Sequence, residues 1–353
     1  MANMPFAVEP HEGDLPRAGS KRRPGMHDVA RLAGVSHQTV SRVLNGNANV
    51  SPRTRALVVA AIEELGYRPN SAARTLVTGR SRTLGLITIA SALYGPMSTL
   101  YGVEAAAREA GYMITVASVG DGEAGALDEA LMNLQKQGVD GIVVVAPLIS
   151  LGDALSSHAR HLPMIAVEGS PGASLPVISV DQSLGARLAT THLLELGHRT
   201  VWHVTGPAGW YETQHRISGW AETLTAAQVD IPPMLRGDWT AQSGYEAGQI
   251  LSRMPDATAV FVANDQMALG LLRALHEHGR TVPDDISVVG FDDMPESANF
   301  IPPLTTVRQP FSDVGRRSLE ALLALIKSGT GSDERIVITP ELVVRRSTSR
   351  PAS

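Results

Sequence analysis

The chain has 353 residues, of which 43% are hydrophobic and none is cysteine. This length is too great for one ordinary domain and predicts two or three. The lack of cysteine excludes disulfides and thiolate metal sites. The net charge of −5 is unevenly divided, because residues 21–82 hold 11 Lys and Arg against 3 acidic residues, a net charge of +8, and residues 83–353 carry −11. A basic segment joined to an acidic body predicts a polyanion-binding unit attached to a second unit.

The first 24 residues are rich in Pro, Gly and charged side chains, which predicts a disordered arm over residues 1–24. They contain no apolar run of signal-peptide length. The longest apolar stretch, near residues 142–149, falls far short of the ~20 residues that span a bilayer. The sequence therefore predicts a soluble cytoplasmic protein with no membrane partner.

Residues 26–45, MHDVARLAGVSHQTVSRVLN, contain two short helical patterns separated by a tight reversal at Gly34. The first is expected from about His27 to Ala33, with Val29, Ala30 and Leu32 among its apolar residues. The second begins after Ser36, which is placed to cap it, and its expected buried stripe is Val40, Val43 and Leu44. This pattern predicts a helix-turn-helix whose second helix is sized for the major groove of DNA.

A third helix is expected after Ser51, the predicted cap, with Pro52 at its first position. It should run to about Leu65 and stop at Gly66. Its expected buried residues are Leu57, Val58, Ala61, Ile62 and Leu65. The segment YRPNSAARTL follows shortly afterwards.

The motifs DVARLAGVSHQTVSRVLN and YRPNSAARTL resemble the DNA-binding headpiece and hinge of the lactose-repressor (LacI) family. FVANDQMALG, PDDISVVGFDD and PPLTTVRQP resemble the family's core motifs, and the resemblance extends from about Arg23 to Arg346. It implies a sequence-specific repressor that binds double-stranded DNA. The expected domains are a helix-turn-helix domain at 25–69, a hinge helix and linker at 70–81, and an effector-binding and dimerisation core at 82–347.

The resemblance also implies how DNA is bound. The hinge segment, residues 70–78, is too short to be a stable isolated helix, so it is expected to fold on the operator. Two copies would insert Leu76 into the minor groove, and small Ala73 would let them pack closely. The residues expected to contact DNA are Met26, His27, Ser36, His37, Gln38, Thr39, Ser41, Arg42, Asn45, Ala73 and Leu76.

The body of the chain alternates strand-like and helical segments, which predicts an α/β core of parallel sheets with helices on both faces. Strands are expected at 83–89, 113–118, 141–146, 163–167, 201–205, 258–262 and 286–291, and helices at 98–110, 124–137, 182–196, 217–227 and 266–279. The resemblance implies a two-lobed core like that of periplasmic binding proteins. The N-lobe would comprise about 82–180 and 310–338, and the C-lobe about 181–309 and 339–347.

Ligands in such folds bind beyond the carboxyl ends of the strands. Polar and aromatic side chains gather there, although aromatic residues are only 4% of the chain. Carboxylates, amides and an arginine can bind hydroxyl groups, and aromatic rings can cover the C–H faces of a sugar, so the sequence predicts a saccharide effector. The residues expected to contact it are Leu93, Pro96, Glu168, Trp210, Glu212, Arg216, Trp239, Asn264, Asp292, Gln309 and Phe311.

The family resemblance supports five of these positions directly: Arg216, Asn264, Asp292, Gln309 and Phe311. Where the name-giving member of the family has small hydroxylated residues, this chain has Trp210-Tyr211-Glu212, which predicts a bulkier and more acidic wall. An Asp after a strand is usually a turn residue or a helix cap. Asp265 and Asp293 fit that ordinary interpretation better than Asn264 and Asp292.

Two other classes of protein, enzymes and periplasmic sugar-binding proteins, fit the sequence less well. The chain has no HExxH, GxSxG, P-loop or GxGxxG motif, so neither an enzyme nor a metal or cofactor is expected. A periplasmic sugar-binding protein is disfavoured by the missing export signal and by the basic headpiece. The alternative within the same fold is a regulator whose co-repressor is a purine or a phosphorylated metabolite, which Trp239 and Glu168 disfavour. A homodimer is expected, because a palindromic site mirrors a two-fold protein and the chain ends soon after its last strand-like run.

Overall fold

The computed structural model describes residues 24–44, 49–68, 79–89, 92–120, 124–145, 149, 162–169, 175–329 and 334–351. The chain divides into two compact units, one before and one after the boundary between Gly79 and Arg80. The predicted arm up to residue 23 and the predicted hinge helix lie outside the described residues, as do the candidate DNA contacts Asn45, Ala73 and Leu76.

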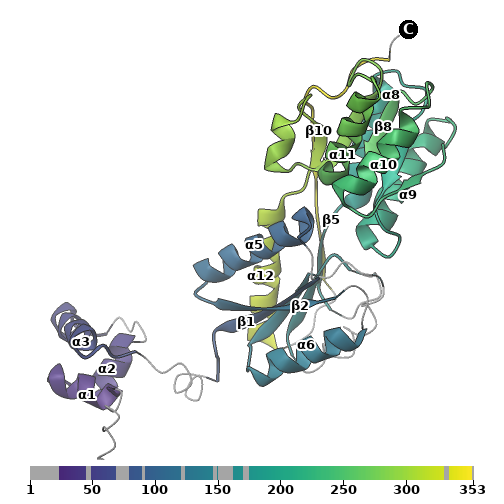
Figure 1. The fold of residues 1–353 in the computed structure, drawn as a ribbon. Helices are drawn as coiled ribbons and strands as arrows, with labels where there is room; N and C mark the ends of the chain where they lie inside the picture. Colours follow the sequence, from purple (N-terminus) through teal and green to yellow (C-terminus); the bar gives the residue numbers. More distant parts are fainter. Residues whose placement is uncertain are drawn as a thin grey trace, which may run out of the picture. The chain divides into compact units, whose positions relative to one another are not determined.

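The first unit is a headpiece of three helices in its described residues, drawn in violet in Figure 1: α1 (Met26–Leu32), α2 (His37–Leu44) and α3 (Pro52–Leu65). Gly34, with φ of +64°, makes the reversal between α1 and α2. The Ser51 hydroxyl accepts a hydrogen bond of 3.1 Å from the backbone N–H of Thr54. Gly66 ends α3 in the left-handed region. The cap and stop signals of the sequence therefore fix this helix as predicted.

The headpiece core is centred on one valine from each helix: Val29, Val40 and Val58, none of which is exposed. Leu57 was predicted to be buried, and that prediction is wrong, because its side chain is 49% exposed. A helix turns about 100° per residue, so Leu57 cannot face the core that its neighbour Val58 fills. Leu32 is also 45% exposed.

The second unit contains two six-stranded sheets. The first sheet has the order β11-β5-β4-β3-β1-β2, and all its strands are parallel. Its strands are β1 (Thr83–Ile89), β2 (Met113–Val119), β3 (Gly141–Val145), β4 (Met164–Val167), β5 (Val177–Val180) and β11 (Arg335–Ile338). The helices α5 (Tyr94–Glu109) and α12 (Phe311–Ser328) pack together on one face, and α6 (Ala124–Lys136) covers the other (Figure 1).

Strand β1 shows how the sequence builds this layered core. Leu84 and Leu86 pack with the residues of α5 and α12, whereas Ile87 and Ile89 pack with those of α6. Successive side chains of a strand point to opposite faces, so a nearly continuous apolar run serves a sheet that is covered on both sides.

The second sheet has the order β12-β10-β9-β8-β6-β7, and β12 is antiparallel to β10. Its strands are β6 (Trp202–Thr205), β7 (Leu235–Arg236), β8 (Ala259–Val262), β9 (Ser287–Asp292), β10 (Thr305–Arg308) and β12 (Glu341–Val343). Its helices are α8 (Gln182–Glu195), α9 (Tyr211–Ala226), α10 (Ala241–Leu251), α11 (Asp265–Glu277) and the short 3-10 helix η2 (Pro295–Asn299). Helix α8 packs against α9, and α10 packs against α11.

The structure corrects several predicted elements. β5 and α10 were not predicted. Helix α5 begins at Tyr94 rather than at residue 98, and α9 begins at Tyr211 rather than at residue 217. Both helices start after a residue whose side chain makes no capping hydrogen bond, Leu93 and Trp210 respectively, so the usual sequence signal for a helix start is missing.

The chain passes between the two sheets at three places: from β5 into α8, from β10 into α12, and from β11 to β12. Gln182 and Gln309 lie at the first two of these crossovers. Within the described part of the chain, no helix is both long and apolar enough to cross a membrane.

Candidate functional site

The exposed face of α2 carries most of the described candidates for DNA contact. Val40 and Val43 are buried, which leaves His37, Gln38 and Arg42 exposed on the same helix. The N-terminus of α2 is fixed by Ser36, whose hydroxyl accepts a 3.1 Å hydrogen bond from the backbone N–H of Thr39. The side-chain oxygens of these two residues also share a 2.9 Å hydrogen bond. Ser36 and Thr39 are therefore already joined by two hydrogen bonds.

The start of α1 lies beside the start of α2. The rings of His27 and His37 stack with centroids 4.5 Å apart. Met26, which is half-buried, packs against the headpiece core, and Ser41 is half-buried. The structure thus brings together two of the candidates, His27 at the start of α1 and His37 at the start of α2.

In the second unit, the side chain of Gln182 is the centre of a buried hydrogen-bond network. Its Nε2 donates to Oε1 of Glu168 at 3.2 Å and to Oε1 of Gln309 at 2.9 Å. Its Oε1 accepts from Nε of Arg216 at 2.9 Å. Gln309 in turn donates through Nε2 to Oδ1 of Asp292 at 2.6 Å. Four predicted effector residues are thus joined through one residue that the sequence analysis did not select.

The guanidinium of Arg216 is held on several sides and is only 3% exposed as a residue. Besides the bond to Gln182, it donates to the carbonyl oxygen of Ala263, and it lies 3.9 Å from Oδ1 of Asp292. Its Cζ atom lies 3.7 Å from the centre of the Phe291 ring. A cation stacked on an aromatic face in this way is oriented as well as stabilised.

Three acidic side chains surround this arginine, and burial raises the pKa of each. The pKa of Glu168 rises to about 7 and that of Asp292 to about 6, in each case because burial disfavours the charged form. The pKa of Glu212 is raised well above its ordinary value by burial and by the charge of Glu168. Arg216 opposes all three shifts.

Several buried polar atoms near the arginine have no hydrogen-bond partner among the described residues. They are Oε2 of Glu212, Oγ1 of Thr213 and Nε1 of Trp239. The ring of Trp239 meets that of Trp210 edge to face, with centroids 5.5 Å apart and planes at 68°. Unsatisfied buried polar atoms are uncommon in native proteins and call for an explanation. A ligand that supplies their partners is one.

The structure reverses the roles expected for two neighbouring residues. Asn264, expected to face a ligand, caps α11, because its Oδ1 accepts a 2.9 Å hydrogen bond from the backbone N–H of Met267. Its Nδ2 donates to the backbone oxygen of Trp239 at 3.1 Å. Asp265, expected to be an ordinary cap or turn residue, is instead fully buried at the first position of the helix. β8 ends at Val262 as predicted, whereas α11 begins at Asp265, one residue earlier than predicted, which makes Asn264 rather than Asp265 the cap.

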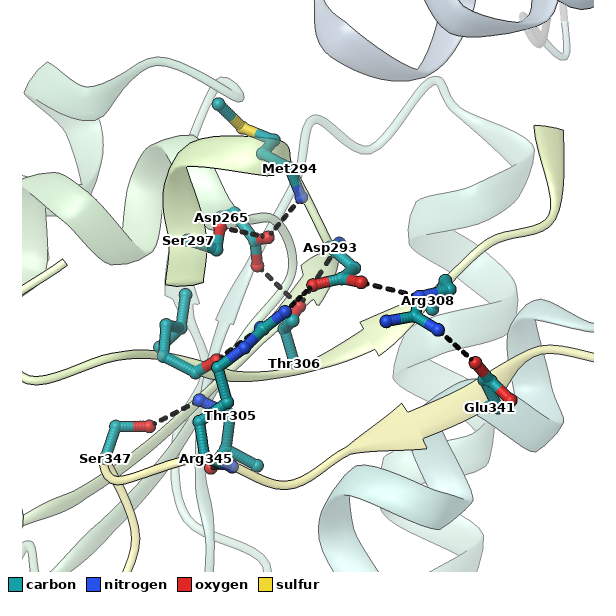
Figure 2. A network of polar contacts seen from close by, with 11 residues as sticks. Asp265, Asp293, Met294, Ser297, Thr305, Thr306, Arg308, Glu341, Arg345 and Ser347 are labelled. Carbon is teal, nitrogen blue, oxygen red and sulfur yellow. Dashed lines mark hydrogen bonds and ion pairs between the residues drawn. The ribbon is translucent and has the colours of Figure 1, made fainter. Parts of the chain in front are cut away.

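Asp265 is the centre of a second polar network, which Figure 2 shows from close by. Its Oδ2 accepts from the Ser297 hydroxyl at 2.6 Å and from the Met294 backbone N–H at 2.9 Å. Its Oδ1 accepts from the Thr306 hydroxyl at 2.6 Å. These bonds tie α11, η2 and β10 together next to the turn that presents Asp292.

Asp293, expected to be a turn residue or a helix cap, is held by ion pairs, and Met294 rather than Asp293 precedes η2. Its carboxylate pairs with Arg308 at 2.6 Å and with Arg345 at 2.5 Å (Figure 2). Arg308 also reaches Glu341 at 2.6 Å. Asp292 and Asp293 therefore serve different networks, although they are adjacent in the chain.

The three apolar candidates from the first sheet's side of the core lie together at helix starts. Leu93 precedes α5 and Pro96 is buried in its first turn. Phe311 begins α12, and its ring meets that of Tyr94 edge to face at 5.7 Å. The pKa of Tyr94 is raised by burial and then by Asp292 among other acids, which places this group within electrostatic reach of the Arg216 network.

The effector contacts expected from the sequence did not include Gln182, Phe291 and Thr213. One signal pointed to Gln182: it follows Asp181, whose carboxylate caps α8 by accepting from the backbone N–H of Leu184 at 2.8 Å. Because β5 was not predicted, Gln182 was not recognised as lying just beyond the carboxyl end of a strand. No cluster of His, Asp and Glu suited to a metal ion occurs among the described residues.

Comparisons with known proteins agree with this architecture. Residues 25–70 match the family model for bacterial regulatory proteins of the lacI family, and residues 190–348 match that for the periplasmic binding protein-like domain. The lactose operon repressor of Escherichia coli (strain K12) is 37% identical over 329 residues, which are 92% of this chain and 91% of that protein. A solved lac repressor dimer, bound to operator and the anti-inducer ONPF, aligns with a TM-score of 0.84 at 35% identity over 93% of this chain and 100% of that chain. A complex of the transcriptional regulator CelR with cellobiose aligns with a TM-score of 0.70 at 34% identity over 92% of this chain and 100% of that chain.

Proposed function

Because the chain belongs to the lacI family of bacterial regulatory proteins, a non-enzymatic family of DNA-binding transcriptional regulators, we propose that its effector is a saccharide. In this proposal a homodimer represses sugar-utilisation genes by binding a palindromic operator. A saccharide, such as a galactoside or a related disaccharide, releases the repressor when it binds the Arg216 network.

The observation that carries the proposal is the chemistry around Arg216. Glutamine, carboxylate and guanidinium groups from both sheets are linked by hydrogen bonds there, and the Trp210–Trp239 pair lies beside them. Polar groups of these types bind neighbouring hydroxyls, and indole faces cover sugar C–H groups. CelR, a relative of similar fold, binds the saccharide cellobiose.

The proposed DNA contacts are those of the headpiece. His37, Gln38 and Arg42 of α2 would read each half-site, and Asn45, Ala73 and Leu76 would add contacts beyond the described residues. Operator binding by a lac repressor dimer supports a two-fold arrangement, in which each subunit supplies one headpiece to each half of the operator.

The proposed coupling uses the crossovers between the sheets. Gln182 and Gln309 bond to one another at 2.9 Å at two places where the chain passes from one sheet to the other. A sugar that takes over these hydrogen bonds changes how the two sheets are held. The resulting coupling to DNA binding would amount to ~1–3 kcal/mol per ligand.

A gel shift with the full chain tests the proposal. The DNA is that flanking its own gene, and the panel contains mono- and disaccharides at a stated ionic strength of about 0.15 M. We expect retardation that one sugar or one group of related sugars abolishes. Retardation that appears or tightens only with a purine or a phosphorylated metabolite would replace the proposal with a co-repressor mechanism.

Two headpiece variants test the proposed DNA contacts, one as the test and one as its matched control. Arg42→Ala should relax specificity at one base pair per half-site, by about 1–3 kcal/mol. Arg53→Ala removes the same charge from the exposed surface of α3 and should leave base preference unchanged. If Arg42→Ala instead weakens binding to all sequences equally, Arg42 contacts phosphate.

A further inference from the structure

The charges around the proposed effector site do not balance. Glu168, Glu212 and Asp292 all interact with Arg216, which is the cation that opposes each of their pKa shifts. Arg216 is already occupied by Gln182, the backbone oxygen of Ala263 and Asp292. With three carboxyl groups and one guanidinium, the site holds more acidic groups than cations, and the raised pKa values show that burial, together with the charge of Glu168 at Glu212, makes the carboxyl groups retain protons.

Of the three carboxyl groups, only that of Glu212 has a buried oxygen atom without a hydrogen-bond partner among the described residues. Oε1 of Glu168 accepts hydrogen bonds from the Val180 backbone N–H and from Gln182. Oδ1 of Asp292 accepts one from Gln309. Oε2 of Glu212 is buried and accepts none from any described residue. A carboxylate in this condition is a strong acceptor without a donor.

Two further unpaired groups lie on the same side. Trp239 is only 5% exposed and Thr213 only 1% exposed, yet Nε1 of the first and Oγ1 of the second have no partner among the described residues. Both border Gly206: a Cβ atom there would come within 2.2 Å of the Trp239 ring and 2.6 Å of the Thr213 hydroxyl. Thr213 follows Glu212 on the first turn of α9. Donor and acceptor atoms that lack partners among the described residues therefore border Gly206, and one of them belongs to the same first turn of α9 as Glu212.

We propose that the effector is an amino sugar, whose protonated amine pairs with the carboxylate of Glu212. This inference rests on the proposed function and narrows it. A neighbouring ammonium group favours the ionised form of Glu212, which gives up its proton on binding, and the ammonium group donates the hydrogen bonds that Oε2 lacks. The uncharged ring of the sugar still meets Trp210 and Trp239.

The same charges select against other effectors. An acidic or phosphorylated sugar meets three carboxyl groups, so the site repels it. A neutral sugar satisfies Glu212 through a hydroxyl group, but it brings no positive charge to offset the excess of acidic groups. An N-acetylated sugar loses the positive charge of the amine and adds volume.

Isothermal titration calorimetry on the full chain tests the proposal with matched probes: glucosamine, glucose and N-acetylglucosamine, and the corresponding set built on galactose and on β-1,4-linked disaccharides. We expect an amino sugar to bind about tenfold or more tightly than its neutral partner, as a charge-assisted hydrogen bond predicts. The preference should weaken as salt is added, because salt screens ionic interactions.

Two variants locate the effect. Glu212→Gln keeps the size of the side chain and should abolish the preference for the amine while retaining binding of the neutral sugar. Glu222→Gln alters an exposed carboxylate of the same helix, 61% exposed at its side chain, and should leave the preference unchanged. Thermal unfolding and operator binding of both variants confirm that they are folded.

Three outcomes separate the possibilities. Equal affinity for amino and neutral sugars overturns the inference and leaves the proposed function standing. A preference that survives in Glu212→Gln also overturns it, because another group then recognises the amine. If none of the sugars binds, with operator binding intact, the proposed saccharide effector itself is wrong.

Discussion

Asp265 and Glu212 are both acidic side chains in the part of the core built on the second sheet, and burial raises the pKa of each. The hydrogen bonding of their carboxyl oxygens differs. Asp265 accepts three hydrogen bonds from Met294, Ser297 and Thr306, whereas Oε2 of Glu212 accepts none from the described residues. A satisfied buried carboxylate holds a structure together, and an unsatisfied one is prepared for a partner. The two networks should therefore respond to mutation in opposite ways.

The largest difference is expected in stability. Asp265→Ala leaves two hydroxyls and one backbone N–H without an acceptor, so the free energy of unfolding should fall by about 3 kcal/mol or more, at ~1–3 kcal/mol per buried group. Glu212→Ala removes no such acceptor and should cost about 1 kcal/mol or less. Urea unfolding followed by tryptophan fluorescence measures both, because all 4 tryptophans lie in the core unit. Equal losses would remove the distinction between the two networks.

Two glycines allow a second comparison. A Cβ atom at Gly290 would come within 2.2 Å of Oδ1 of Asp265, and one at Gly206 within 2.2 Å of the Trp239 ring. Crowding of this kind costs ~1–3 kcal/mol. Gly290→Ala should lower the free energy of unfolding most, while Gly206→Ala should weaken effector binding about tenfold or more. Calorimetry and urea unfolding on both variants check this, and the opposite assignment of effects would contradict it.

Two fully buried serines provide a finer comparison. The Ser297 hydroxyl donates to Asp265 at 2.6 Å, whereas Oγ of Ser318 has no partner among the described residues. Ser297→Ala should lower the free energy of unfolding by about 1–2 kcal/mol. Ser318→Ala should be neutral or stabilising, because it removes an unsatisfied polar atom. The urea midpoints of the two variants measure this difference. If both variants lost the same free energy of unfolding, burial of the serine rather than its hydrogen bond would determine the loss.

The smallest expected effect is on the dependence of stability on pH. The pKa values of Asp265 and Glu168 are raised to about 7 and that of Asp292 to about 6. Between about pH 4 and 7 these three groups bind more protons in the folded chain than in the unfolded chain, so their contribution to stability should fall as pH rises. Urea midpoints from pH 5 to 8 measure this slope.

Variants can divide this slope between the two networks. Asp265→Asn should flatten it mainly below pH 7. Glu212→Gln should flatten it as well, because burial raises the pKa of Glu212 and the folded chain therefore holds that proton more tightly than the unfolded chain. A slope unchanged in both variants would place the titration elsewhere, with Glu222→Gln as the exposed control.

The sequence predicted the headpiece best because cap and stop residues close to each helix end mark where its helices begin and end. Ser36, Ser51, Pro52 and Gly66 are cap and stop signals, and each acts as expected. The starts of α5 and α9 were misplaced because neither has a capping side chain. Local signals therefore limit what can be predicted about element boundaries.

The site was predicted in part for a similar reason. Charged and aromatic residues after strands stood out, and most of them gather around Arg216. Gln182 did not stand out, because it acquires its role only from Arg216 and Gln309, which are 34 and 127 residues away in the chain. The exchange of roles between Asn264 and Asp265 depends on where α11 begins, to within one residue. Neither fact is visible without long-range contacts.

The order of the strands has a consequence for how the protein is made. The edge strands β11 and β12 complete the first and second sheets respectively, and both come from the last part of the chain, Arg335–Ile338 and Glu341–Val343. The headpiece helices are complete by Leu65. Since domains generally fold from the N-terminus during synthesis, a growing chain carries its helix-turn-helix long before either sheet of the core can close. A product cut short before residue 335 would keep the headpiece and lack an edge strand in both sheets, so translation must pass Val343 before both sheets are complete.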